Sequence, residues 1–178
     1  SMTLFKLSGR AHRELRVFAG RQYRIVSRNN VESYRRRKGA IESLLAGGGL
    51  IPDLVDYFDP NTNRVPIKVA EPVVSGSLDR YGLNATQLAA FEKLWQYGPI
   101  GLLQGPPGTG KTNFIAALSH YAVTQGGLNS VLILSQANES TNHAAEKVLD
   151  FSAEYGGNIS IIRVGNAGKV SDRLKDYH

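Results

Sequence analysis

The chain has 178 residues, of which 42% are hydrophobic, and a formal net charge of +6 at pH 7. This length suits one domain with an appendage, and the composition is sufficient for a packed core. We expect no membrane segment, because no apolar run approaches ~18 residues, and no metal cluster or disulfide, because cysteine is absent. A cytoplasmic location fits this composition. Ser1 before Met2 is typical of a tag-cleavage remnant, so residues 1–2 are set aside.

The positive charge is concentrated near the N-terminus. Eleven basic and two acidic residues lie within residues 1–38, a local net charge of +9 that leaves −3 for the remainder. A basic end joined to a nearly neutral body suggests a polyanionic partner. A solvated surface, or an arm that packs on other protein, explains the same charges equally well. Composition alone does not choose between these interpretations.

Residues 3–76 are predicted to form a basic, mostly helical N-terminal extension. The spacing of apolar residues predicts a helix from Asn30, as its cap, to Ala46. A short second helix is expected within 50–58. Alternating valines and isoleucines follow within 64–74, but two prolines limit this stretch to an edge strand or an extended linker.

Residues 77–178 show alternating strand and helix patterns. This order favours a parallel sheet with right-handed crossovers, and therefore an α/β fold. The first helix is capped by Asn84 and carries an apolar stripe up to Trp95. The remaining expected elements are strands at 100–104, 131–134 and 159–164 and helices at 111–124 and about 140–151.

A glycine-rich segment between the first strand and the next helix matches the pattern G-x-x-x-x-G-K-[ST] in full. Glycines let the backbone turn so that successive N–H groups point into one concavity, and the helix that follows adds the positive end of its dipole. Strand, loop and helix is the context that a phosphate-binding loop requires. The residues expected to surround the phosphates are Gly105, Pro106, Pro107, Gly108, Thr109, Gly110, Lys111 and Thr112.

Two residues of this loop are the predicted catalytic groups. Lys111 is expected to reach the β- and γ-phosphates of ATP, and the Thr112 hydroxyl is expected to ligate Mg²⁺. ATP and Mg²⁺ are therefore the predicted cofactors. The alternative is a glycine-rich turn that matches the pattern by chance.

The segment Leu83-Asn84-x-x-Gln87, followed by a strand and Gly-Pro-Pro-Gly-Thr-Gly-Lys-Thr, resembles the start of the motor in superfamily 1 helicases of the Upf-type branch. The resemblance implies a partial RecA-like P-loop NTPase sheet flanked by helices. It also implies that Gln87, with Asn84 beside it, contacts adenine. From the residues alone, Asn84 and Gln87 also form a helix capping box, and the two roles are compatible.

A second similarity covers Val131-Leu132-Ile133-Leu134-Ser135-Gln136-Ala137-Asn138 and the helix that follows. It resembles the family's motif Ia, which implies contacts from Ser135, Asn138 and Thr141 to a single strand of DNA or RNA. Gln136 and Ala137 depart from the common Pro-Ser form. Helix capping by Asn138 or Ser140 is the alternative. A third, weaker similarity is Ile162-Arg163-Val164-Gly165.

An ATPase motor also needs an apolar strand that ends in Asp-Glu, and this sequence contains none. We therefore predict an N-terminal ATP-binding fragment of an ATP-dependent helicase, with the remainder of the polypeptide as its partner and negligible hydrolysis alone. Three alternatives stay open: an AAA+ or other P-loop ATPase, a small-molecule kinase, and a nucleotide-regulated module that binds nucleic acid or protein. Backbone contacts do not distinguish DNA from RNA.

Overall fold

The computed structural model describes residues 28–178 except positions 50, 52, 63 and 75. The chain divides into two compact units, Ser1–Thr62 and Asn63–His178. Residues 63–76 thus belong to the second unit, whereas the sequence placed them with the basic extension. Residues 3–27 of that extension, with the six basic side chains that precede Arg28, lie outside the described residues. Among the described helices, none is long and apolar enough to cross a membrane.

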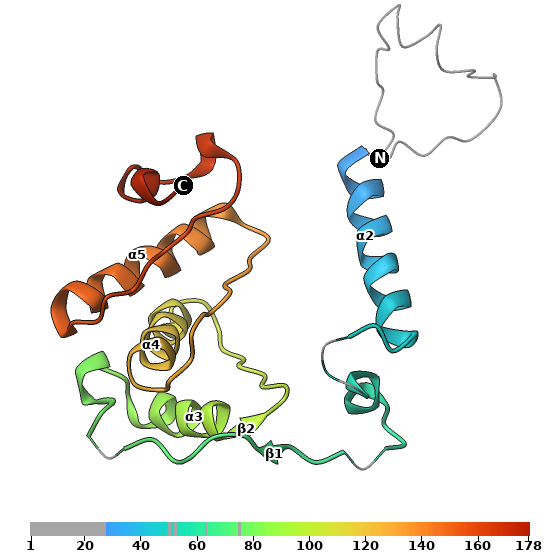
Figure 1. Ribbon diagram of the computed structural model, residues 1–178, viewed down its shortest axis with the longest axis horizontal. Coiled ribbons are helices and arrows are strands. Elements are labelled where there is room, and N and C mark those ends of the chain that lie inside the picture. Colours follow the sequence, from blue (N-terminus) through green and yellow to red (C-terminus); the bar gives the residue numbers. More distant parts are fainter. Residues whose placement is uncertain (1–27, 50, 52, 63, 75) are drawn as a thin grey trace, which may run out of the picture. The chain divides into compact units, whose positions relative to one another are not determined.

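The first unit contains the α-helix α2 (Arg28–Leu45) and the 3-10 helix η1 (Leu54–Phe58) (Figure 1). The predicted helix is confirmed, but it begins before Asn30, which is therefore inside the helix and not its cap. Its apolar side chains are largely exposed, for example Tyr34 and Leu45 at 66% each. Ion pairs along the helix join Arg35 to Glu32 and Lys38 to Glu42.

The second unit is mainly helical (Figure 1). In chain order its elements are β1 (Ile67–Lys68), η2 (Asp79–Tyr81), α3 (Ala85–Gln96), β2 (Tyr97–Gly98), α4 (Lys111–Thr124), α5 (Asn138–Tyr155), η3 (Ala167–Lys169) and η4 (Asp172–Tyr177). The helices α3, α4 and α5 confirm the three predicted helices, although α5 extends further at both ends than expected.

The core of the second unit is built from aromatic side chains on these helices. Phe91 of α3 is fully buried and meets Phe114 and Tyr121 of α4 edge-on, at centroid distances of 5.8 and 5.4 Å. Tyr81 of η2 meets Phe151 of α5 edge-on at 5.1 Å. Edge-to-face pairs of this kind are favourable beyond the area that they bury. These contacts join α3 to α4 and η2 to α5, and His120 of α4 also meets Tyr81 and Phe151 edge-on.

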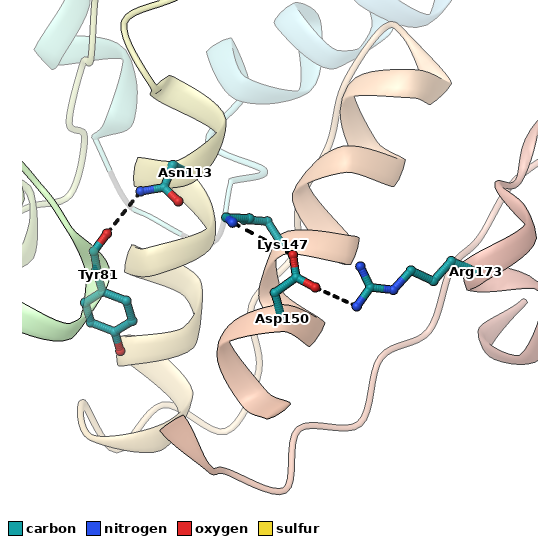
Figure 2. A network of polar contacts seen from close by, with 5 residues as sticks. All are labelled: Tyr81, Asn113, Lys147, Asp150 and Arg173. Carbon is teal, nitrogen blue, oxygen red and sulfur yellow. Dashed lines mark hydrogen bonds and ion pairs between the residues drawn. The ribbon is translucent and has the colours of Figure 1, made fainter. Parts of the chain in front are cut away.

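A smaller cluster attaches the C-terminal segment to α5. Leu174 of η4 is fully buried, and it packs with Val170 and Ala145. On the surface, Asp150 of α5 pairs with Arg173 at 2.6 Å and with Lys147 at 3.8 Å (Figure 2). Exposed pairs contribute little to stability, so the apolar contact of Leu174 is the stronger attachment.

The expected parallel sheet is not formed in the described residues. Their one sheet pairs β1 with β2 in the antiparallel sense, Ile67 opposite Gly98 and Lys68 opposite Tyr97. The segments 100–104, 131–134 and 159–164 carry no strand assignment. The structure therefore shows a mixed composition of helices and a small sheet, and the parallel sheet of the expected fold is not formed within the described chain.

The exposure of these segments explains the difference. In the segment 159–164 the side chains alternate, with Ile161 and Arg163 turned inward while Ile162 and Val164 are about 80% exposed. Leu132 and Leu134 are both 81% exposed. Parallel sheets are stable when both faces are covered. Within the described residues, Ile159 and Ile161 pack against a core cluster that includes residues of α4 and α5, and the outer side chains stay exposed.

Candidate nucleotide-binding site

The glycine-rich loop leads from the extended segment 100–104 directly into α4. Gly108 and Gly110 have φ angles of 81° and 77°, in the left-handed region that residues with a Cβ rarely adopt. Gly110 is the N-cap of α4 and offers no side chain to the first N–H groups of the helix. Those donors have no partner within the helix, so the start of α4 is arranged to bind an anion.

Contacts inside the loop fix its shape. The Thr109 hydroxyl donates to the carbonyl of Pro106 at 2.8 Å. A Cβ on Gly105 would lie 2.7 Å from the Thr109 Oγ1 atom, so this position needs glycine for space. The first glycine of the pattern thus makes room for an internal hydrogen bond, and only the later two supply left-handed turns.

The ammonium of Lys111 lies against the loop itself. Its Nζ donates to the carbonyl of Gly105 at 2.6 Å and to that of Pro106 at 2.7 Å. No carboxylate of the described chain forms an ion pair with it. A cation that is held by neutral carbonyls and lacks a counter-ion is suited to a phosphate group. The hydrogen-bond donors of the loop therefore fit the phosphates of a nucleoside triphosphate.

The first turn of α4 is anchored to the rest of the unit. Thr112 follows Lys111 and is exposed. The next residue, Asn113, donates from Nδ2 to the Tyr81 carbonyl of η2 at 3.2 Å (Figure 2). This bond fixes the turn that carries Lys111 and Thr112 against η2.

Gln87 joins the helix α3 to the phosphate-binding loop. The sequence predicted the loop but not this contact. Its Oε1 accepts the Asn84 backbone N–H at 2.9 Å, and the Asn84 Oδ1 accepts the Gln87 N–H at 2.9 Å, which confirms the capping box. The Gln87 Nε2 then donates to the carbonyl of Thr109 at 3.0 Å. One amide therefore caps α3 and holds the loop.

The three residues expected at nucleic acid lie in a separate region of the second unit. The Ser135 Oγ accepts the Ala137 N–H at 3.2 Å, Asn138 begins α5, and Thr141 is half-buried in its first turns. No hydrogen bond in the described chain joins them to residues 105–112. A cavity of about 600 Å³ extends from Thr141 between the segments 129–133 and 158–164.

Arg163 is a buried residue that sequence reasoning did not select. Its side chain is 6% exposed, and it bonds to the side chains of Asn142 and Asn138. The signal was present in the sequence, because Arg163 stands between Ile162 and Val164 within an otherwise mostly apolar segment. Such a position points to a buried, hydrogen-bonded charge or to a functional group.

A buried histidine stabilises the far end of α4. His120 is 1% exposed, its Nδ1 lies 2.8 Å from the Tyr81 hydroxyl, and its Nε2 lies 3.0 Å from the Gly156 carbonyl. Since a carbonyl only accepts, Nε2 carries the proton and Nδ1 accepts from the tyrosine. Burial lowers the pKa of His120 and raises the pKa of Tyr81 to about 12.

The loop, its lysine and the start of α4 define a phosphate-binding domain. A sequence profile described as an AAA domain matches residues 82–178, which is more than half of the chain. The chain belongs to this AAA domain family. The matched region contains α3, the loop, α4 and α5.

Curated relatives are similar over part of the chain. A regulator of nonsense transcripts 1 homolog of Arabidopsis thaliana is 42% identical over 37% of this chain and 5% of its own length. An uncharacterized ATP-dependent helicase of Methanocaldococcus jannaschii is 30% identical over 52% of this chain and 13% of its own. A DNA replication ATP-dependent helicase/nuclease of Saccharomyces cerevisiae is 31% identical over 60% of this chain and 7% of its own length.

These similarities confirm the resemblance to Upf-type superfamily 1 helicases that the sequence showed. The chain spans only a small fraction of each of these relatives. No solved structure gives a significant match to it.

Proposed function

We propose that the chain is the N-terminal ATP-binding part of an ATP-dependent helicase, which in the full-length protein couples ATP hydrolysis to translocation on single-stranded DNA or RNA. The observation that carries the proposal is the contact of Lys111 with two loop carbonyls at the uncapped start of α4. Two of the relatives are named as ATP-dependent helicases. RecA-like organisation of this part of the motor belongs to the same proposal.

The residues of the loop divide the work of holding Mg·ATP. Lys111 exchanges its two carbonyl partners for phosphate oxygens, and the N–H groups at the start of α4 donate to the same phosphates. Thr112 is exposed at the helix start and supplies its hydroxyl to Mg²⁺. Bound Mg²⁺ would neutralise charge on the phosphates.

Asn84 and Gln87 lie at the start of α3, where Gln87 contacts the loop. Gln87 is the proposed adenine contact. In the structure its Oε1 and one hydrogen of Nε2 are already in use. An amide oxygen accepts two hydrogen bonds and an amide nitrogen donates two. Gln87 therefore retains one acceptor and one donor for a base edge, while Asn84 acts by holding Gln87 in place.

Ser135, Asn138 and Thr141 are the proposed contacts to the backbone of a single strand. They lie where the segment 131–134 ends and α5 begins. Short hydroxyl and amide side chains are suited to phosphate and sugar contacts, which carry no base information. The proposal therefore leaves both DNA and RNA as substrates.

Binding of Mg·ATP tests the proposal directly. Isothermal calorimetry and thermal shift should detect Mg·ATP binding by the wild-type chain, and Lys111→Ala should abolish it. Lys93→Ala, which removes an exposed lysine of α3, is the matched control and should bind as the wild type does. An absence of heat and thermal shift on folded wild-type protein would refute nucleotide binding.

Hydrolysis is the second measurement. Since the sequence has no apolar strand that ends in Asp-Glu, we expect phosphate release well below ~1 s⁻¹. Turnover at or above this rate that is lost in Lys111→Ala would show that the chain carries a complete catalytic site, contrary to the proposal.

A further inference from the structure

Arg163 is a buried cation whose partners are neutral. Its Nε donates to the Asn142 Oδ1 at 2.9 Å, its Nη2 donates to the Asn138 Oδ1 at 3.2 Å, and its Nη1 donates to the Val164 carbonyl. None of the described acidic side chains forms an ion pair with it. The guanidinium thus donates to three neutral oxygens, two of which belong to asparagine side chains on the first turns of α5.

The chain provides space for this arrangement. A Cβ on Gly165 would lie 3.0 Å from Arg163 Nη1, and the φ angle of Gly165 is 150°. The segment is also fixed from the C-terminal side, because the Arg163 N–H donates to the Tyr177 carbonyl at 2.6 Å. The packing of the Arg163 guanidinium therefore accounts for the glycine at position 165.

A guanidinium dictates how an amide beside it is turned. Arginine has only donors, so the oxygen of each asparagine must face it and the NH₂ group must face away. The Asn142 NH₂ is used inside the protein, where it donates to the Lys169 carbonyl at 2.9 Å. Asn138 is exposed, and its Nδ2 has no recorded acceptor among the described residues.

We propose that Arg163 is a positioning residue that turns the Asn138 amide outward as a hydrogen-bond donor to the phosphate backbone of a single strand. The inference rests on the proposed nucleic-acid role of the loop at 135–141. It adds the reason for which the NH₂ group of this amide faces outward: its oxygen is turned toward Arg163. An outward NH₂ group matches phosphate oxygens, which only accept.

Three variants test the inference, with a labelled oligothymidylate and oligouridylate of about 15 nucleotides as probes. Arg163→Lys keeps the charge but loses the fork that reaches two amides, and affinity should fall about tenfold, or ~1.4 kcal/mol. Asn138→Asp replaces the donor by a carboxylate that pairs with Arg163. It should lose at least as much affinity while its melting temperature is unchanged or raised, a combination that a structural role does not produce.

The third variant, Asn138→Ala, completes a double-mutant cycle. If Arg163 acts through Asn138, adding Arg163→Lys to Asn138→Ala should change affinity by less than about twofold. Arg173→Lys, at an exposed arginine paired with Asp150, is the matched control and should bind as the wild type does. Thermal shifts with Mg·ATP should be the same in all variants.

The outcomes separate the inference from the proposed function. Wild-type affinity in Arg163→Lys or Asn138→Asp, or additive losses in the cycle, would overturn the role of Arg163 while leaving nucleic-acid binding in place. Failure of the wild-type chain to bind either probe would remove the proposed role of the loop, and the inference with it. Because Asn138→Asp retains a partner for Arg163, wild-type affinity in this variant would overturn the inference even if Arg163→Lys does not fold.

Discussion

Gln87 Nε2 donates to the Thr109 carbonyl at 3.0 Å, so the residue that closes the capping box of α3 also holds the loop that starts α4. A Cβ on Gly110 would lie 2.9 Å from the same Nε2 atom. The side chain of Gln87 therefore occupies space that only a glycine at position 110 leaves open. This relationship links the stability of α3 to the shape of the phosphate-binding loop.

Gln87→Glu separates the two roles of this side chain. The carboxylate still accepts the Asn84 N–H, so the free energy of unfolding should change by less than about 0.5 kcal/mol. The donor to Thr109 is lost, and affinity for Mg·ATP should fall about tenfold, as measured by calorimetry. Asn84→Ala is the counterpart: it should cost about 1 kcal/mol of stability and affect Mg·ATP binding less. The reverse pattern would contradict the assignment.

Gly110→Ala should destabilise the protein more than an alanine at another left-handed glycine. Gly110 and Gly127 have φ angles of 77° and 72°, so each substitution costs about 1–2 kcal/mol of backbone strain. At Gly127 the added Cβ meets nothing within 4 Å, whereas at Gly110 it displaces Gln87. Urea unfolding should show the larger loss for Gly110→Ala, and only this variant should bind Mg·ATP more weakly. Equal losses of stability would mean that the contact with Gln87 is unimportant.

Stability should fall as the pH is lowered below about 6.5, and His120 should be the cause. Its folded pKa is below the ordinary value of 6.5, so in this range the unfolded chain binds a proton that the folded chain does not. The stabilisation is present above pH 6.5 and is lost as the pH falls toward the folded pKa, with a slope of at most about 1.4 kcal/mol per pH unit.

Urea titrations between pH 5 and 8 measure this effect. The slope should disappear in His120→Gln and persist in His143→Gln, which changes an exposed histidine of α5. Asp172, whose pKa is lowered by its bond to Lys175, loses its contribution only below its ordinary value of 3.8 and does not overlap this window. A slope that survives in His120→Gln would assign the effect to another group.

Phe91→Ala and Leu132→Ala should differ sharply in their effect on stability. Phe91 is fully buried among aromatic rings, and its truncation should cost about 3–5 kcal/mol. Leu132 is 81% exposed, so its truncation should cost less than about 0.5 kcal/mol. Denaturant unfolding of both variants checks the difference. A large loss in Leu132→Ala would show that the outer side of the segment 131–134 is covered in solution.

The sequence by itself determined the local features of this protein. The loop at 105–112, the capping box of Asn84 and Gln87, and the helices α3, α4 and α5 were all predictable, because glycine spacing, capping and helical periodicity act over a few residues. The resemblance to Upf-type helicases rests on the same short segments. The predicted contacts of Gln87 to adenine, and of Ser135, Asn138 and Thr141 to nucleic acid, stay predictions.

Only the tertiary structure decided which distant residues meet. The bond from Gln87 to Thr109 and the bonds from Arg163 to Asn138 and Asn142 join residues more than 20 positions apart, and no local pattern specifies them. The expected sheet failed for a related reason. Strand propensity at 100–104, 131–134 and 159–164 favours extended backbone, but a parallel sheet also needs apolar cover on both faces, and the exposed Leu102, Leu132 and Ile162 show that the described residues do not provide it.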